Sequence, residues 1–169
     1  MIVTTHRLVA TSYHNTIGTA PAALTIVSGD TVVTDTIDAR GFDKDGAGVG
    51  KSPNPMNGPI FVEGAEPGDA LRVEIVAMRP IRDTGWTLSV LAPNVVDPDI
   101  LRTLPEAKKT TWHIDRNALT TRLAEPPKGL EDFVLPLTPM IGCFGVAPAS
   151  GEAISTMTSG RHGGNMDYR

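Results

Sequence analysis

Glycine and proline recur so often along this chain that long helices are excluded. The 169 residues include 17 Gly and 14 Pro, roughly one helix-breaking residue every five or six positions. Apolar residues make up 40% of the chain and charged residues 20%, which is typical of a folded globular protein. We therefore expect a mainly β fold, a β-sandwich or barrel-like domain of short strands with one short helix, over residues 1–169.

Several short segments show the alternation of apolar and polar residues that half-buried strands have. The clearest is segment 71–76, in which Leu71, Val73 and Ile75 would share one face. Segment 23–37 alternates on both sides of a turn at Ser28-Gly29-Asp30 and predicts a hairpin. The other strand candidates are 3–10, 59–63, 86–91, 110–115, 133–137 and 141–146.

One helix is predicted near residue 98. Asp97 is a suitable N-cap and Pro98 suits the first helical position, so the helix should run to about Leu104, before Pro105. Polar connectors and the longest loop are expected at 106–110, 125–129 and 40–57.

Two Gly-Asp pairs, Gly29-Asp30 and Gly68-Asp69, each precede a segment with strand character. Glycine supplies the positive φ of a tight turn, and we expect the aspartate to bind the backbone N–H groups that follow it. The two segments are interpreted as similar hairpin entries.

Charge and cysteine content exclude some classes of function. The chain has 15 Lys and Arg against 19 Asp and Glu, so binding to nucleic acid is not expected. The N-terminus has neither a signal-peptide pattern nor an apolar stretch long enough to span a membrane. A single cysteine, Cys143, forms no intrachain disulfide and fits a reducing compartment, so we expect a cytoplasmic protein.

The C-terminal segment 159–167 is rich in groups that carry chemistry. It contains three glycines together with His162, Asn165 and Asp167. Glycines allow close approach of a ligand, the imidazole can bind a metal or move a proton, and the carboxylate can ligate or orient. The alternative is a polar terminal turn without fixed structure.

A second candidate site is the acidic turn at 58–69. Glu63 ends an apolar run, so partial burial would suit it to act as a general base, whereas Glu66 beside Pro67 should be solvated. A structural, ion-paired Glu63 is an equally good interpretation.

Other candidate side chains have weaker support. His14 and Asp38 follow strand-like segments and are candidate metal ligands, but no metal-binding spacing such as HExxH or CxxC supports them. His6 and His113 fit satisfied or half-exposed histidines better than ligands. Cys143 lacks an adjacent basic residue and is predicted to be a small apolar residue rather than a nucleophile.

Four ordered segments carry a resemblance to a known family. They are GDTVVTDTIDA (29–39), NGPIFVEGAEPGDALRVEI (57–75), PMIGCFGVAPA (139–149) and HGGNMD (162–167). In these motifs and their order the sequence resembles the acetamidase/formamidase family of amide hydrolases.

The resemblance implies a β-rich, oligomeric, cytoplasmic enzyme that hydrolyses the C–N bond of short aliphatic amides such as formamide or acetamide. It also implies a divalent metal, with zinc favoured. The resemblance implies catalytic roles for Glu63, His162 and Asp167, and Glu66 lies in the same acidic motif as Glu63. It implies that Gly163, Gly164 and Asn165 bind the substrate and that Asp38, His162 and Asp167 bind the metal. The alternative is a non-catalytic binding or assembly module that retains the amidase scaffold.

Family members continue beyond the HGGNMD motif into a Gly/Asp/His/Glu-rich segment, whereas this sequence ends at Arg169. Three interpretations are compatible with this ending: the chain is a fragment, it is a domain that is inactive alone, or it is one subunit of a two-chain enzyme. We therefore expect a homo-oligomer or a complementary C-terminal chain as partner, besides the small amide substrate. Catalysis in this chain would require Glu63 and Asp167 to face each other across one cleft.

Overall fold

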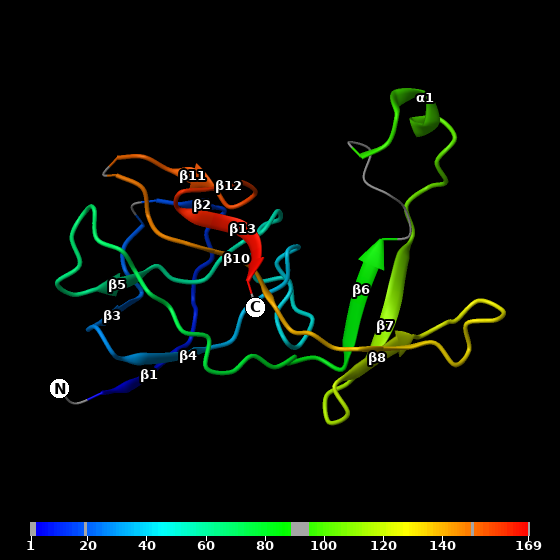
Figure 1. Ribbon diagram of the computed structural model, residues 1–169, viewed down its shortest axis with the longest axis horizontal. Helices are drawn as coiled ribbons and strands as arrows, with labels where there is room; N and C mark the ends of the chain where they lie inside the picture. Colours follow the sequence, from blue (N-terminus) through cyan, green and yellow to red (C-terminus); the bar gives the residue numbers. More distant parts are fainter. Residues whose placement is uncertain (1–2, 19, 89–94, 150, 169) are drawn as a thin grey trace. The chain divides into compact units, whose positions relative to one another are not determined.

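The computed structural model describes residues 3–18, 20–88, 95–149 and 151–168. The chain divides into two compact units, the first formed by Met1–Met78 with Met140–Arg169 and the second by Arg79–Pro139. Both units consist of short strands, and the described residues contain one α-helix of four residues (Figure 1). The predicted mainly β class with one short helix is confirmed. The closure of the small sheets into one sandwich or barrel, as a single domain over 1–169, stays a prediction.

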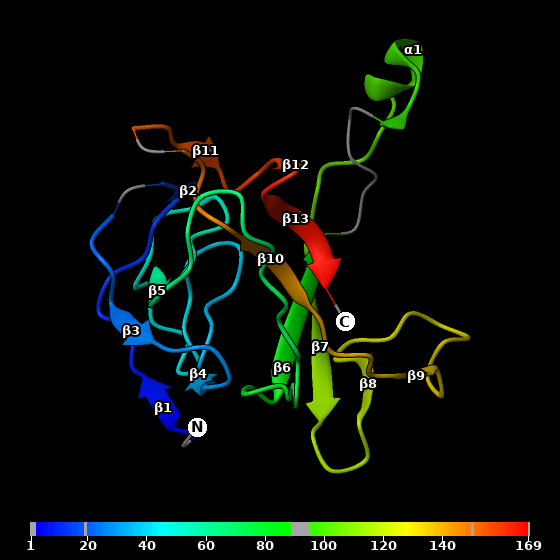
Figure 2. The same ribbon diagram turned by 60° about the vertical axis from the view of Figure 1, so that its left-hand side comes forward.

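The first unit contains four small sheets (Figures 1 and 2). Strands β1 and β4 pair in parallel, as do β3 and β5, while β2 pairs antiparallel with β11 and β13 lies between β10 and β12. The strands are β1 Thr5–Leu8, β2 Thr16–Ile17, β3 Leu24–Ile26, β4 Thr31–Thr34, β5 Ile60–Val62, β10 Ile141–Gly145, β11 Ile154–Ser155, β12 Ser159–Gly160 and β13 Gly163–Tyr168.

The predicted hairpin over 23–37 is wrong, although both of its strands exist. Asp30 explains the difference, because its Oδ1 accepts a hydrogen bond from the Thr4 backbone N–H at 3.0 Å. The Thr31 N–H in turn donates to the Thr4 carbonyl at 2.9 Å. The turn therefore directs β4 onto β1 and leaves β3 to pair with β5.

The two Gly-Asp turns have the same local structure, as the sequence predicted. In each, the aspartate N–H donates to the carbonyl three residues earlier, Val27 for Asp30 and Glu66 for Asp69. The carboxylate accepts from the N–H of that same earlier residue, at 3.1 Å in the first turn and 2.9 Å in the second. The bonds run to preceding residues, not to following ones as expected, because the turn closes back on its own start.

Segment 71–76 is not a strand, which contradicts the clearest strand prediction. It is drawn as a coil between β5 and β6 (Figure 1), and none of its residues pairs with another described residue. Its alternating side chains Leu71, Val73 and Ile75 are 48%, 50% and 37% exposed. A strand needs a neighbour for its backbone groups, and no described segment supplies one.

The buried core is small for a chain of this length. Among the described residues, Leu8 and Ile17 are the buried hydrophobic side chains, at 7% and 8% exposure, and Thr156 is fully buried. The accessible surface is 12470 Å², whereas a folded monomer of this size exposes about 8,000 Å². Much of the apolar surface therefore lies in contact with solvent.

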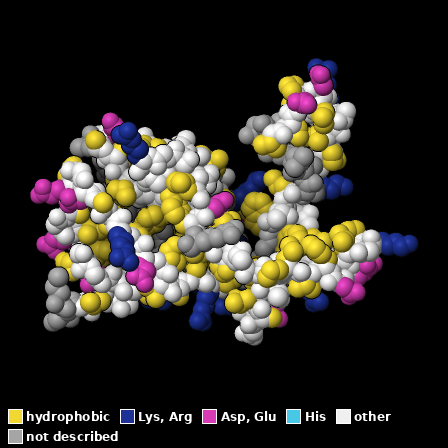
Figure 3. Space-filling view, in the orientation of Figure 1, with side chains coloured by type: hydrophobic (Ala, Val, Ile, Leu, Met, Phe, Trp, Pro, Cys, Tyr) yellow, Lys and Arg dark blue, Asp and Glu magenta, His cyan; other side chains and the backbone are white. Residues whose placement is uncertain are grey.

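The second unit is an antiparallel sheet in the order β6-β7-β8-β9. Its elements are β6 Thr84–Leu88, α1 Pro98–Leu101, β7 Lys109–Asp115, β8 Thr120–Leu123 and β9 Val134–Pro136. Hydrophobic side chains gather along the arm that contains β8 and β9 (Figure 3), including exposed Leu130, Phe133 and Val134. His113 lies on β7 and is exposed. The sequence predicts a satisfied or half-exposed histidine there rather than a metal ligand.

The helix starts where it was predicted and ends earlier. Asp97 is the N-cap residue and Pro98 opens α1, but the Asp97 side chain makes no capping hydrogen bond. The helix stops at Leu101 rather than near Leu104, and the Thr103 N–H donates to Ile100 at 2.8 Å in a tighter turn. None of the described helical residues forms a segment long and apolar enough to cross a membrane.

We predict that Asp30→Asn destabilises the first unit in a pH-dependent way. Hydrogen bonds from Thr4, Val27 and His6 hold the Asp30 pKa below its ordinary value of 3.8. A carboxyl with a lowered folded pKa stabilises the fold above its unfolded pKa and loses this contribution as the pH falls through the folded pKa. Urea unfolding should therefore separate wild type from Asp30→Asn at pH 7, and the difference should shrink as the pH falls below 3.8.

The matched control is Asp69→Asn, in the twin turn. Asp69 makes the same bonds within its turn but has no counterpart of the Thr4 and His6 contacts. Equal losses of stability in the two variants would show that the contacts of Asp30 to β1 contribute nothing.

Candidate active site

The glycine-rich tail is a strand at the centre of a sheet, which rules out the alternative of a loose terminal turn. β13 pairs with β10 through Phe144↔Gly164 and Gly145↔Gly163, and with β12 through Ser159↔Gly164. The sequence did not predict this strand, because its glycines lower β propensity. The HGGNMD motif is therefore held between two neighbouring strands.

The two glycines of the motif are required by conformation and by space. Gly163 and Gly164 have φ values of +86° and +99°. A Cβ on Gly163 would lie 2.6 Å from Tyr168 Oη and 2.7 Å from the Phe144 carbonyl oxygen, and one on Gly164 would overlap the Thr158 carbonyl oxygen. The expected close backbone approach is present, and it serves the packing of β13 against its neighbours.

Two buried polar atoms beside these glycines have no hydrogen-bond partner among the described residues. They are His162 Nε2 and Tyr168 Oη. Leaving such a group unsatisfied costs about 1–3 kcal/mol, so each needs a hydrogen-bonding group from water, a ligand or another polypeptide. The atoms flank the motif glycines, since the Cβ position of Gly163 is near Tyr168 Oη and that of Gly164 is 2.9 Å from His162 Nε2.

Tyr168 is the residue that sequence reasoning missed. Its ring packs edge-on against Phe144, with centroids 5.9 Å apart and planes at 79°. This packing fixes the ring over Gly163 and holds the hydroxyl inside the sheet. The sequence feature that could have identified Tyr168 is its position directly after the HGGNMD motif. It was overlooked because the motif glycines made a strand there unexpected.

Asp167 lies at an irregularity of the same sheet. The register between β10 and β13 shifts between Ile141 and Cys143, and Asp167 has a φ of +54°. Aspartate tolerates this left-handed conformation better than most residues. Asp167 and Asn165 are both exposed, and His162 precedes the other end of β13.

The acidic turn is not brought to β13. Glu63 follows β5, is exposed rather than partly buried as predicted, and donates its N–H to the Ile26 carbonyl at 2.8 Å. β5 pairs with β3, and Figures 1 and 2 both draw it apart from β13. The turn at 63–69 is closed by its own Asp69, and none of the described hydrogen bonds joins it to β13, so the cleft between Glu63 and Asp167 stays a prediction.

Asp38, one of the predicted metal ligands, closes a local turn instead. Asp38 Oδ1 accepts from the N–H groups of Arg40 and Phe42 at 2.9 and 3.1 Å, which closes a turn. His14 makes two backbone hydrogen bonds of 2.9 Å with Met56.

No three His, Cys, Asp or Glu side chains within the described part of the chain could together hold a metal ion. The set Asp38, His162 and Asp167 therefore does not fit a metal site.

His6, bonded to Asp30 at 2.9 Å, confirms the satisfied histidine that was predicted.

Cys143 is a packed thiol, as predicted. Its Sγ lies 3.3 Å from Met56 Sδ and 3.3 Å from the Thr156 carbonyl oxygen. Burial raises the pKa of the Cys143 thiol, which disfavours the thiolate form that a nucleophile needs.

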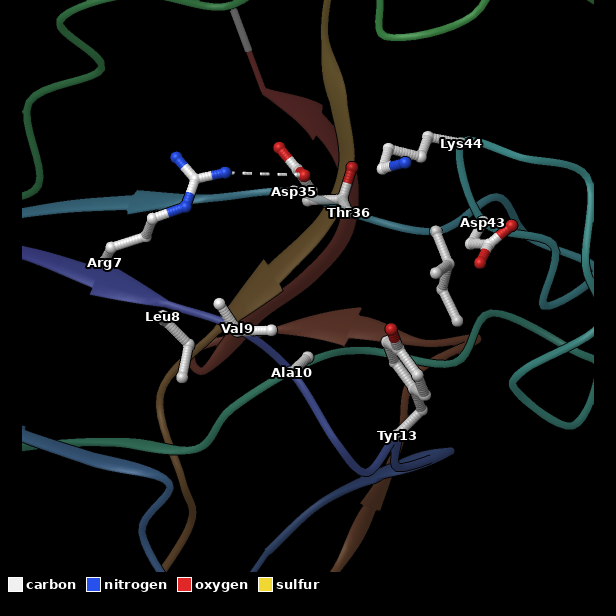
Figure 4. Close-up of a pocket in the computed structure, with 10 residues that line it drawn as sticks. Arg7, Leu8, Val9, Ala10, Tyr13, Asp35, Thr36, Asp43 and Lys44 are labelled. Atoms are coloured by element: carbon white, nitrogen blue, oxygen red, sulfur yellow. Dashed lines mark ion pairs between the residues drawn. The ribbon is translucent and has the colours of Figure 1, made fainter.

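A separate open cavity of about 180 Å³ lies beside the ends of β1 and β4 (Figure 4). Arg7 pairs with Asp35 at 3.8 Å on one side, and Tyr13, Asp43 and Lys44 line the other. None of the predicted catalytic residues lines it, so it is distinct from the β13 site.

The chain was compared with known proteins at the level of family, sequence and structure. A profile described as the Acetamidase/Formamidase family matches residues 4–162. The crystal structure of an acetamidase from Yersinia enterocolitica is similar, with 26% identity and a TM-score of 0.63. That match covers 96% of this chain and 52% of the acetamidase, so the chain spans about half of its length. No curated protein matches the sequence.

We predict that Gly164→Ala destabilises the first unit far more than Gly68→Ala. Both glycines have φ near +100°, but a Cβ meets nothing within 4 Å at Gly68 and overlaps backbone at Gly164. Conformational strain alone costs about 1 kcal/mol, and strain with a backbone clash should exceed about 3 kcal/mol. Denaturant unfolding measures both, and similar losses would show that β13 does not pack closely in solution.

Proposed function

Because the chain belongs to the acetamidase/formamidase family, we propose that it supplies one half of an amide hydrolase acting on short aliphatic amides such as formamide or acetamide. The observation that carries the proposal is the β13 motif. Its glycines hold the backbone tightly between β10 and β12, and two unpartnered buried polar atoms, His162 Nε2 and Tyr168 Oη, lie beside them. Buried polar groups without a partner in the protein are rare, and a catalytic role is one of the explanations for them.

The reaction needs a proton acceptor and a proton donor. Water adds to the amide carbonyl carbon and loses one proton, the C–N bond breaks, and the nitrogen takes up that proton and leaves as ammonia. The carboxylic acid that remains then gives its proton to ammonia, so the final products are a carboxylate and ammonium. An imidazole can accept and return a proton near neutral pH, which suits His162. The Tyr168 hydroxyl can donate a hydrogen bond to the oxygen on which negative charge develops.

The remaining motif residues have supporting roles in this proposal. Gly163 and Gly164 hold β13 against its neighbours and so position His162 and Tyr168, and Asn165 and Asp167, exposed on the same strand, orient the substrate. Glu63 stays the carboxylate general-base candidate from the acidic motif. Its place beside β3 means that it would act with groups other than those of β13.

The family resemblance favours zinc, but the residues predicted to bind it here do not come together. The proposed steps therefore use only the side chains of this chain. Metal content is best measured on the protein after it has been joined by the second half of the family fold. Cytoplasmic location and a homo-oligomer likewise stay predictions.

We predict that Tyr168→Phe lowers ammonia release from formamide or acetamide at least about tenfold without loss of stability. Removing a buried hydroxyl that has no partner should leave the unfolding midpoint unchanged or raise it. His162→Gln should cost at least about 10² in turnover, the usual size of general acid–base catalysis. Tyr13→Phe, which removes a hydroxyl from the separate cavity, is the matched control and should leave turnover unchanged.

The assay uses the full chain, alone and together with the second half of the family fold. Wild-type protein that folds and assembles, with zinc supplied, but releases no ammonia from either amide would contradict the proposed function. It would favour the alternative of a non-catalytic assembly module.

We predict that Glu63→Gln separates catalysis from stability if Glu63 is the general base. Its side chain is exposed, so the melting temperature should not change, while turnover should fall at least about 10². Glu66→Gln in the same turn is the control. Equal turnover in the two variants removes Glu63 from the mechanism.

A further inference from the structure

We propose that segment 71–76 is a strand that forms only against a partner, and that the partner is the second half of the acetamidase fold. The segment would add to a sheet of that partner, with Leu71, Val73 and Ile75 packed against it. This inference rests on the proposed function in one respect, that the chain is one half of an enzyme. It adds which surface the other half covers.

The sequence of the segment is that of a strand. Leu71, Val73 and Ile75 alternate with Arg72 and Glu74, and the apolar residues of such a pattern belong on the covered face of a sheet. Here all three are more than one-third exposed. The pattern is therefore satisfied by nothing in the described part of the chain.

The backbone of the segment is equally unpaired. The last backbone hydrogen bond before it is Asp69 N–H to the Glu66 carbonyl at 3.0 Å. None of residues 71–76 exchanges a backbone hydrogen bond with another described residue. An extended segment with free N–H and C=O groups and an apolar face has the features required for strand addition to a partner sheet.

The total surface shows that the partner is large. Even two independent domains with the sizes of the two units would together expose about 9,600 Å², compared with the 12470 Å² observed. The excess of roughly 2,900 Å² lies on this chain alone, and a partner that covered all of it would bury about 5,800 Å² counted over both surfaces, which is in the range of large obligate interfaces. A small ligand cannot cover this area.

The comparison with the acetamidase indicates which polypeptide would cover segment 71–76. This chain covers 52% of that protein, so the family fold contains a further segment about as long as this chain. A second copy of this chain would supply the same half again. The other half of the family fold is the partner that completes it, and segment 71–76 is the strand it would pair with.

The test compares two lysine substitutions on opposite faces of the segment. The full chain is co-expressed with a polypeptide that carries the second half of an acetamidase-family protein from the same genome. Val73→Lys places a charge on the apolar face, and Glu74→Lys, the control, places the same charge on the other face. Both positions are exposed, so neither should change the stability of the chain alone.

The expected result is a one-to-one complex in which the amides of 71–76 exchange with deuterium at least about tenfold more slowly than in the chain alone. Val73→Lys should weaken the complex at least about tenfold, and Glu74→Lys should weaken it far less. The readouts are native mass spectrometry, a binding titration and hydrogen exchange.

Three results would overturn the proposal: no complex with such a polypeptide, a complex that leaves 71–76 unprotected, or protection of 71–76 in a homodimer of this chain. These outcomes are separate from those of the activity assay. A protected complex without ammonia release leaves the interface intact and rejects the amidase function, whereas ammonia release by a complex that leaves 71–76 unprotected does the reverse.

Discussion

The close contact between two backbones, at Gly145 of β10 and Gly163 of β13, is the constraint on which the C-terminal sheet depends. A Cβ on Gly145 would lie 2.7 Å from the His162 carbonyl oxygen and 2.8 Å from Ile17 Cδ1. The absence of side chains at this point lets β13 enter between β10 and β12, next to the small core around Ile17. Because the same contact sets the path of the chain at His162, the motif glycines position the imidazole by packing, before any contact with a substrate.

The parts of the fold that could be predicted are those set by local chemistry. The Gly-Asp turns follow from the φ of glycine and the short reach of aspartate, although the carboxylates accept from preceding rather than following N–H groups. The start of α1 follows from Pro98. The packed state of Cys143 follows from the apolar residues around it. Each of these depends on a few neighbouring residues, so one sequence contains the information needed.

The predictions that were wrong concern elements whose pairing depends on residues distant in the sequence. Nothing near Ser28 indicates that Asp30 will bind Thr4, yet this contact turns an expected hairpin into two parallel pairs. β13 was missed because its glycines lower strand propensity, while the reason for them, the neighbouring backbones, lies in other segments. Segment 71–76 failed in the opposite sense, since its local pattern is that of a strand and no described segment pairs with it.

The exposed apolar segment and the unpartnered polar atoms are two different kinds of unmet requirement. An apolar face such as that of Leu71 and Val73 is stabilised when another surface covers it and removes it from water, and any complementary surface of sufficient size can do so. His162 Nε2 and Tyr168 Oη need a hydrogen-bonding group at a defined position, which area alone does not provide. Completion of the fold can therefore cover the strand without satisfying the site. This difference allows assembly and catalysis to be measured independently, although both are expected to need the same second half of the fold.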